Sequence, residues 1–136
     1  MAGNTPHPAI THPSVDGLAS PGGHYSHVAI ANGFAFVSGQ LPITEAGEKL
    51  VDAPFDAQAR QVLFNLERAL RAAGCGIGDL VQVRVYLADV ADWPGFNALY
   101  ADWAGAARPA RAIVPTGALH YGLRVEIEAT ALLPRA

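Results

Sequence analysis

The sequence predicts a layered α/β domain, in which two helices pack on one face of a single β-sheet. Three observations support this fold class: two stretches have helical spacing of apolar residues, several short stretches have strand character, and their order is β-β-α-β-α-β-β. The chain has 136 residues, of which 51% are hydrophobic. This is enough for one domain with a hydrophobic core.

The first two strands are expected near residues 27–31 and 34–39. Between them lies Asn32-Gly33, and both residue types tolerate the positive φ that a tight hairpin needs. Residues before this hairpin are rich in Pro, Gly, His, Thr and Ser. We therefore expect residues 1–22 to form a partly ordered N-terminal arm and residues 23–136 to form a single domain.

The first helix is expected over residues 54–73, after a loop or second turn in residues 40–50. Its apolar stripe consists of Ala59, Val62, Leu63, Leu66, Leu70 and Ala73, and the polar residues off it include Gln58, Arg60, Gln61, Arg68 and Arg71. Gly74 is a natural C-cap. Phe64 falls on the polar face, either to meet a neighbouring subunit or as an exposed aromatic side chain.

The next strand and helix follow in residues 80–104. Strict alternation places Val81, Val83, Val85 and Leu87 on one face, and Gln82, Arg84 and Tyr86 on the other. Asp92 is a candidate N-cap for a second helix that has Pro94 in its first turn and runs to about Ala104.

Two further strands complete the sheet, a short one at residues 111–114 and a longer one at residues 123–132. The longer strand alternates Leu123, Val125, Ile127 and Ala129 with Arg124, Glu126, Glu128 and Thr130. Because both helices cover one face, the half-polar opposite face is available for contact with another copy. Charged residues make up only 15% of the chain, against about 25% in an ordinary soluble domain. We therefore expect a homo-oligomer.

Charge and targeting signals exclude several classes of protein. The net charge is −3 and Lys49 is the only lysine, which argues against a nucleic-acid partner. The N-terminus lacks the pattern of a signal peptide, and no apolar run has the length of a membrane span. The single cysteine, Cys75, fits a reducing compartment, so we expect a cytoplasmic protein without a membrane partner.

Three charged residues are candidates for chemistry. Arg111 lies in the apolar segment PARAIVP, where a guanidinium needs either an acidic residue of this protein or an anionic ligand. Glu126 and Glu128 share one strand face, about 7 Å apart by strand rise. They fit either a structural lattice with the arginines of the sheet or a catalytic carboxylate.

Metal and nucleotide sites are not indicated by the sequence. His24 and His27 have no third partner at metal-ligand spacing. The glycines of GCGIG follow a helix instead of opening one, unlike the phosphate-binding motifs. We therefore expect no metal site and no nucleotide cofactor.

Seven segments, taken together, resemble the RidA/YjgF family of reactive-intermediate deaminases, whose older members were called L-PSP endoribonucleases. They are GGHYSH (22–27), FVSGQLP (36–42), AQARQVLFNLERALRAAG (57–74), DLVQVRVYLADV (79–90), FNALYADW (96–103), PARAIV (109–114) and VEIEATAL (125–132). They occur in the order and spacing of the family and cover nearly everything from residue 22 to residue 132.

The resemblance implies a chorismate-mutase-like fold, with a mixed sheet backed by two helices. It also implies a homotrimer whose sheets line a barrel-like core, with three clefts between subunits. The implied activity is hydrolysis of 2-imino and enamino acids, such as 2-aminoacrylate, to 2-keto acids and ammonia, without cofactor.

The resemblance also assigns roles to individual residues. Arg111 matches the arginine that binds the substrate carboxylate, and Glu126 matches the glutamate that positions or activates water. The residues implied to contact substrate are Tyr25, Ser38, Asn97 and the backbone of Ala112 and Ile113.

The chain departs from the family pattern at His24, Ile113, His120 and Tyr121, which leaves the substrate open; a larger or differently charged imino acid is one possibility. The sequence leaves two alternative functions. One is a trimeric protein that binds small carboxylates without turnover, or has a regulatory role. The other is the ribonuclease activity of the older name, which the acidic chain disfavours.

Overall fold

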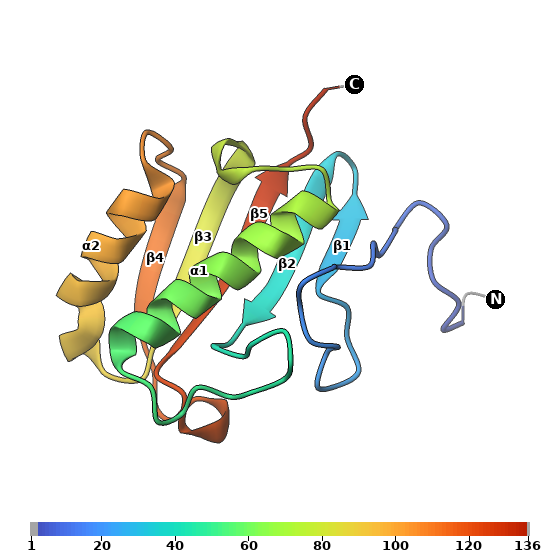
Figure 1. Ribbon diagram of the computed structural model, residues 1–136. Coiled ribbons are helices and arrows are strands. Elements are labelled where there is room, and N and C mark those ends of the chain that lie inside the picture. The colour runs from blue at the N-terminus through green and yellow to red at the C-terminus, as the bar shows by residue number, and fades with distance from the viewer. Residues whose placement is uncertain (1–2, 136) are drawn as a thin grey trace.

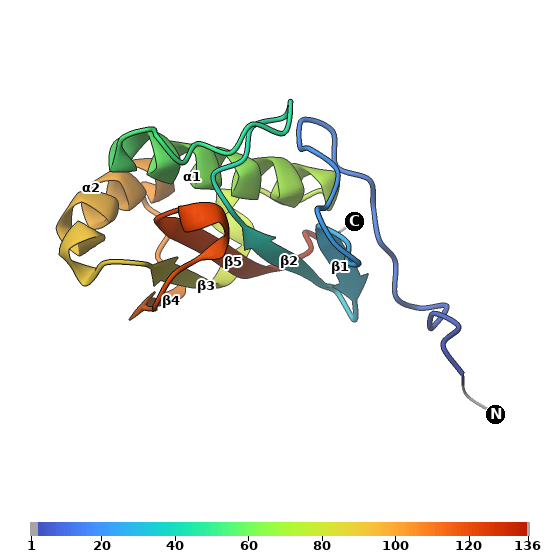
Figure 2. The same cartoon turned by 90° about the horizontal axis from the view of Figure 1, so that it is seen from below.

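The computed structural model describes residues 3–135 as one five-stranded sheet covered on one face by two α-helices (Figure 1). Figure 2 shows both helices on the same side of the sheet. The strands are β1 (Val28–Ala31), β2 (Phe34–Gln40), β3 (Leu80–Leu87), β4 (Ala110–Pro115) and β5 (Val125–Leu132), and the helices are α1 (Phe55–Ala72) and α2 (Trp93–Ala104). The predicted fold class and element order are confirmed. Met1, Ala2 and Ala136 lie outside the described residues.

The sheet has the order β1-β2-β5-β3-β4. Strands β3 and β4 pair in parallel across the α2 connection, and the other pairs are antiparallel, so the sheet is mixed. The β1-β2 hairpin turns at Asn32 and Gly33, whose φ angles are 55° and 81°. These are the positive values that an Asn-Gly turn predicts. Strand β4 is left at an edge of the sheet.

The core lies between the two helices and the sheet, and it buries most of the predicted stripe of α1. The C-cap of this helix is Ala73 and not the predicted Gly74, which follows it directly with φ 78°. The prediction that Gln58 lies off the apolar stripe is wrong, because its side chain is fully buried. Its Nε2 donates to the carbonyl of Ala53 at 3.2 Å, and its Oε1 accepts from the N–H of Arg124 at 2.9 Å. Burial of the amide is tolerated because both ends are hydrogen-bonded.

Two further expectations are wrong. Val81 is 44% exposed because the β3-β5 register shifts between Leu80 and Gln82, which takes Val81 out of the inward alternation. Asp92 stands at the N-cap position of α2, but its carboxylate makes no cap hydrogen bond. Both of its oxygens accept from Arg124 instead, at 2.7 and 2.9 Å.

The segment before β1 runs along the hairpin and then away from the sheet (Figure 2). Thr11 forms an isolated antiparallel bridge with Ile30, and the His27 ring nitrogen Nε2 lies 2.8 Å from the carbonyl oxygen of Ala19. The division into an arm and a domain at residue 22 stays a prediction. Phe64 is 45% exposed beneath the Arg68 guanidinium, and its contact with another subunit also stays a prediction.

Within residues 3–135, neither long helix combines the length and apolar character that crossing a lipid bilayer requires.

Candidate active site

The first hollow opens where β2 and β5 meet the loops before β1 and β5. It has a volume of about 520 Å³ and is lined by Tyr25, Ser38, Gly39, Leu41, Ile43, His120, Tyr121, Glu126 and Glu128, together with Gly22 and Gly23. Three of the predicted site residues, Tyr25, Ser38 and Glu126, are therefore brought together here. The aromatic rings of Tyr25 and Tyr121 are each about half exposed.

Glu126 is partly buried and lies against the backbone of β2. At Gly39, an added Cβ would clash with Glu126 Oε2 and lie 3.1 Å from its Cδ, so the carboxylate occupies space that only glycine leaves free. Burial raises the pKa of Glu126, the charge of Glu128 raises it further, and His120 partly opposes both. The site thus shifts a carboxylate toward the range in which it exchanges protons near neutral pH.

The two glutamates have different surroundings. Glu128 accepts a hydrogen bond from the hydroxyl of Tyr86 at 2.8 Å and pairs with Arg84 at 3.5 Å. For Glu128 this is the structural arginine–glutamate pairing that the sequence left open as one alternative, and it involves one arginine, Arg84. Burial and the hydrogen bond to Glu128 raise the pKa of the Tyr86 hydroxyl. Glu126 has no salt bridge within residues 3–135, so it is the freer carboxylate.

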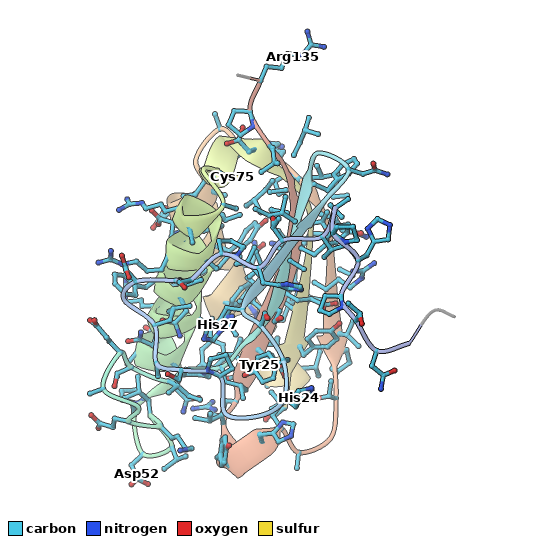
Figure 3. The ribbon with its side chains drawn as sticks, turned by 90° about the vertical axis from the view of Figure 1, so that its right-hand side faces the viewer. His24, Tyr25, His27, Asp52, Cys75 and Arg135 are labelled. Atoms are coloured by element: carbon cyan, nitrogen blue, oxygen red, sulfur yellow. The ribbon has the colours of Figure 1, made fainter. Side chains whose placement is uncertain are left out.

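Buried amides hold the walls of this hollow in place. The Gln40 side chain lies 3.1 Å from His27 Nδ1, and the Asn65 amide donates to the carbonyls of Leu41 and Ile43 at 3.0 Å each. Figure 3 shows Tyr25 and His27 side by side, far from Cys75 at the end of α1, and their rings meet edge to face at 6.1 Å. Asn65 and Gln40 were not predictable from the sequence, since a polar residue on a helix or strand carries no sign of its burial.

The second hollow lies between α2 and β4. It has a volume of about 420 Å³, and its polar lining comes from Asn97, Tyr100, Arg108 and Arg111. The Arg111 Cζ lies 4.8 Å from the centroid of the Tyr100 ring, a cation–π contact. Within residues 3–135 Arg111 makes no salt bridge, so the protein supplies no acidic partner for it there.

Tyr100 is a residue that the sequence analysis did not single out. It is 7% exposed, and its ring contacts the rings of Phe96 and Trp103 in tilted arrangements. Its hydroxyl is the one buried side-chain polar atom among residues 3–135 without a hydrogen-bond partner. Burial raises its pKa, with the Arg111 charge acting in the opposite direction. Its ring therefore acts as a neutral, rigid platform for the guanidinium.

Arg111 and Glu126 lie on opposite faces of the sheet. Arg111 pairs in register with the buried Val83, so it points to the helix face. Glu126 pairs with Tyr86 and alternates with the buried Val125 and Ile127, which puts it on the other face. One chain therefore does not bring the two predicted catalytic residues to one ligand.

The remaining predicted residues are less involved in either hollow. Ala112 is exposed on β4, Ile113 packs against the core, and neither lines the hollows above. His24 is exposed and lines neither of them. Among residues 3–135, no three side chains of metal-ligating type come together.

Comparison with known proteins gives the family. The model of the family described as endoribonuclease L-PSP matches residues 18–133. The chain belongs to this family. L-PSP is the older name of the RidA/YjgF family, so the resemblance carried by the seven segments is confirmed.

Relatives agree in both sequence and fold. A goat protein named 2-iminobutanoate/2-iminopropanoate deaminase is 37% identical over 110 residues, covering 81% of this chain and 80% of its own. The crystal structure of RidA from the Antarctic bacterium Psychrobacter has a TM-score of 0.85 at 31% identity, covering 90% and 99% of the two chains. Escherichia coli TdcF with bound serine has a TM-score of 0.84 at 28% identity, covering 91% and 99%.

Proposed function

We propose that this protein hydrolyses reactive 2-imino and enamino acids to 2-keto acids and ammonia, in clefts between the subunits of a homotrimer. The observation that carries the proposal is a pair of residues: Arg111, a cation without an acidic partner within residues 3–135, and Glu126, a partly buried carboxylate on the opposite sheet face. A second copy that presents its Glu126 to Arg111 would complete the site. The goat relative, named as a deaminase of this kind, supports the reaction.

Arg111 is the anchor in this mechanism. A guanidinium offers two parallel N–H donors that match a carboxylate, and partial burial strengthens the pairing. The Tyr100 ring fixes one face of the guanidinium, which leaves its edge for the ligand. Asn97 lines the same hollow and can donate to the carboxylate or accept from the imine nitrogen. Serine, the ligand in the Escherichia coli TdcF structure, also carries a carboxylate.

Glu126 acts as general base and then as general acid in the proposed reaction. As a carboxylate it accepts a proton from water while the oxygen adds to the carbon of the protonated C=N group, giving a neutral carbinolamine. It then returns that proton to the nitrogen, the C–N bond breaks, and ammonia leaves as the C=O bond forms and the hydroxyl proton is released to water. Tyr25 and Ser38 line the same hollow as Glu126 and contact the substrate in this proposal. The remaining proposed contacts come from the backbone of Ala112 and Ile113. Because imines hydrolyse readily in water, orientation supplies most of the required acceleration.

Complementation between inactive variants tests this arrangement. An imine is generated in situ from alanine by an amino-acid oxidase, and keto-acid release is followed with Arg111→Ala, with Glu126→Gln, and with both variants co-assembled. Each variant alone should be inactive. In random mixed trimers, about a quarter of the clefts combine an intact Arg111 with an intact Glu126, so that fraction of the wild-type rate should return. A mixture that stays inactive although the subunits exchange would refute a shared site.

The same assay addresses the other candidate functions. Binding of a small carboxylate by wild type without faster keto-acid release would support a binding or regulatory protein. RNA cleavage that survives in Arg111→Ala after repurification would support the ribonuclease named in the family description. A monomeric mass in gel filtration would contradict the trimer.

A further inference from the structure

A second arginine, Arg108, lines the same hollow as Arg111. We propose, on the basis of the function proposed above, that the site prefers imino acids with a second carboxylate. Arg111 binds the carboxylate beside the imine carbon and Arg108 binds the distal one. The substrate class is then the 2-imino acids of four or five carbons that derive from dicarboxylic amino acids.

The charge of the hollow is unusual for this chain. Lys and Arg number only nine in the whole sequence, and the net charge is −3. Two of these nine line one hollow, and no aspartate or glutamate of the described residues 3–135 lines it. The arginines that form salt bridges within residues 3–135 are Arg71, Arg84 and Arg124. A positive concavity in an acidic protein attracts anions and discriminates by their charge.

The backbone fits a ligand with two separated anionic groups. Arg108 precedes Arg111 by three residues, so their Cα atoms are at most about 10 Å apart in extended chain. Pro109 between them restricts the backbone, which limits how the two side chains can move relative to each other. The hollow of about 420 Å³, which both arginines line, has room for an imino acid of four or five carbons.

The two arginines have different surroundings, and this fixes which carboxylate each binds. Arg111 is partly buried and held by the Tyr100 ring, whereas Arg108, which also lines the hollow, is exposed. The carboxylate beside the imine carbon needs the rigid anchor, because the reacting carbon must face Glu126 of another copy. The distal carboxylate then extends toward Arg108. A monocarboxylic imine would use Arg111 alone and would gain nothing from Arg108.

The test compares two imines on wild type, Arg108→Gln and Arg108→Lys. The monocarboxylic imine is generated from alanine and the dicarboxylic imine from aspartate or glutamate, each by a matching amino-acid oxidase. Wild type should prefer the dicarboxylic imine in kcat/KM. Arg108→Gln should lower that value on the order of 10- to 100-fold, mainly through KM, and leave the monocarboxylic imine unchanged. For the dicarboxylic imine, Arg108→Lys should have a kcat/KM between those of wild type and Arg108→Gln.

Arg71→Gln is the matched control, since it removes the same charge from an exposed position on α1. Arg71→Gln should leave kcat/KM unchanged for both imines. A binding experiment adds a readout that is independent of turnover: by calorimetry, 2-oxoglutarate should bind wild type more tightly than pyruvate, and Arg108→Gln should abolish the difference.

The outcomes separate the two proposals. If wild type accelerates neither imine, the deaminase function fails. If it accelerates the alanine-derived imine at least as well as the dicarboxylic one, or if Arg108→Gln affects both equally, only the dicarboxylate preference is overturned. A lower solution mass for Arg108→Gln would assign Arg108 to a contact between copies and would also overturn that preference.

Discussion

Replacement of Gly39 by alanine tests the position of the Glu126 carboxylate. An added Cβ at residue 39 would collide with Oε2 of Glu126 and would lie 3.1 Å from its Cδ and 3.5 Å from its Cγ. The atom that must move is the end of a side chain and not backbone. The φ of Gly39 is not in the left-handed region, so alanine itself introduces no backbone strain there.

The expected effect is large on activity and small on stability. To restore ordinary contact, the carboxylate oxygen has to move by about 1 Å or more, and a misplacement of that size costs about 100-fold in rate. The side chain can rotate toward the open hollow, so the free energy of unfolding should change by less than about 1 kcal/mol. Gly39→Ala should therefore be a folded but nearly inactive protein.

The assay combines keto-acid release from an in situ imine with thermal unfolding of the same sample. Gly78→Ala is the control, because a Cβ there would meet nothing within 4 Å. It should keep both activity and stability. A Gly39→Ala protein with full activity would show that the carboxylate position is not critical, and one that fails to fold would show that the clash is not relieved by rotation.

Four further predictions concern individual side chains. Burial raises the pKa of Glu126 in the folded state, so its contribution to stability is fully present below the unfolded pKa and is lost as the pH rises through the folded pKa. Glu126→Gln should therefore raise Tm at pH 7, with little gain at pH 4. The ionised form is the active one, so kcat/KM should fall as pH drops through this raised pKa. In His120→Gln, where an opposing influence is lost, that acid limb should move to higher pH. Gln58→Leu removes the partners of two backbone groups and should lower the free energy of unfolding by about 2 to 4 kcal/mol in urea titrations. Tyr100→Phe removes an unpaired hydroxyl and should keep both stability and activity, whereas Tyr100→Leu, which removes the ring beneath Arg111, should raise KM.

Much of the fold could be predicted because its signals are local. The alternation in β5 and the apolar stripe of α1 follow directly from which face of each element is buried. The hairpin turn follows from Asn32 and Gly33, since both residue types tolerate the positive φ that they adopt there. The errors arise where tertiary contacts decide. Gln58 is buried because two distant backbone groups need its amide, and no helical spacing records that need. The register shift next to Val81 depends on how β5 aligns with β3.

The candidate site was predictable to a smaller extent. Arg111 stood out because a guanidinium in an apolar segment demands a partner, and the structure shows no acidic one within residues 3–135. The grouping of Tyr25 with Glu126 rested on the family resemblance, since about 100 residues separate them in the sequence. Tyr100 and Arg108 gave no signal, because their hollow exists only once α2 packs beside β4.

The placement of Arg111 and Glu126 on opposite sheet faces has a physical consequence for the proposed reaction. On one face of neighbouring strands, an arginine and a glutamate would pair, as Arg84 and Glu128 do. Such a pair would satisfy the guanidinium and lower the pKa of the carboxyl, so neither would be available to an incoming imino acid. Separation by the sheet keeps both groups free of salt bridges within residues 3–135. A function that needs them together would therefore depend on assembly, and dilution below the dissociation constant of the oligomer should abolish activity while the fold of each chain persists.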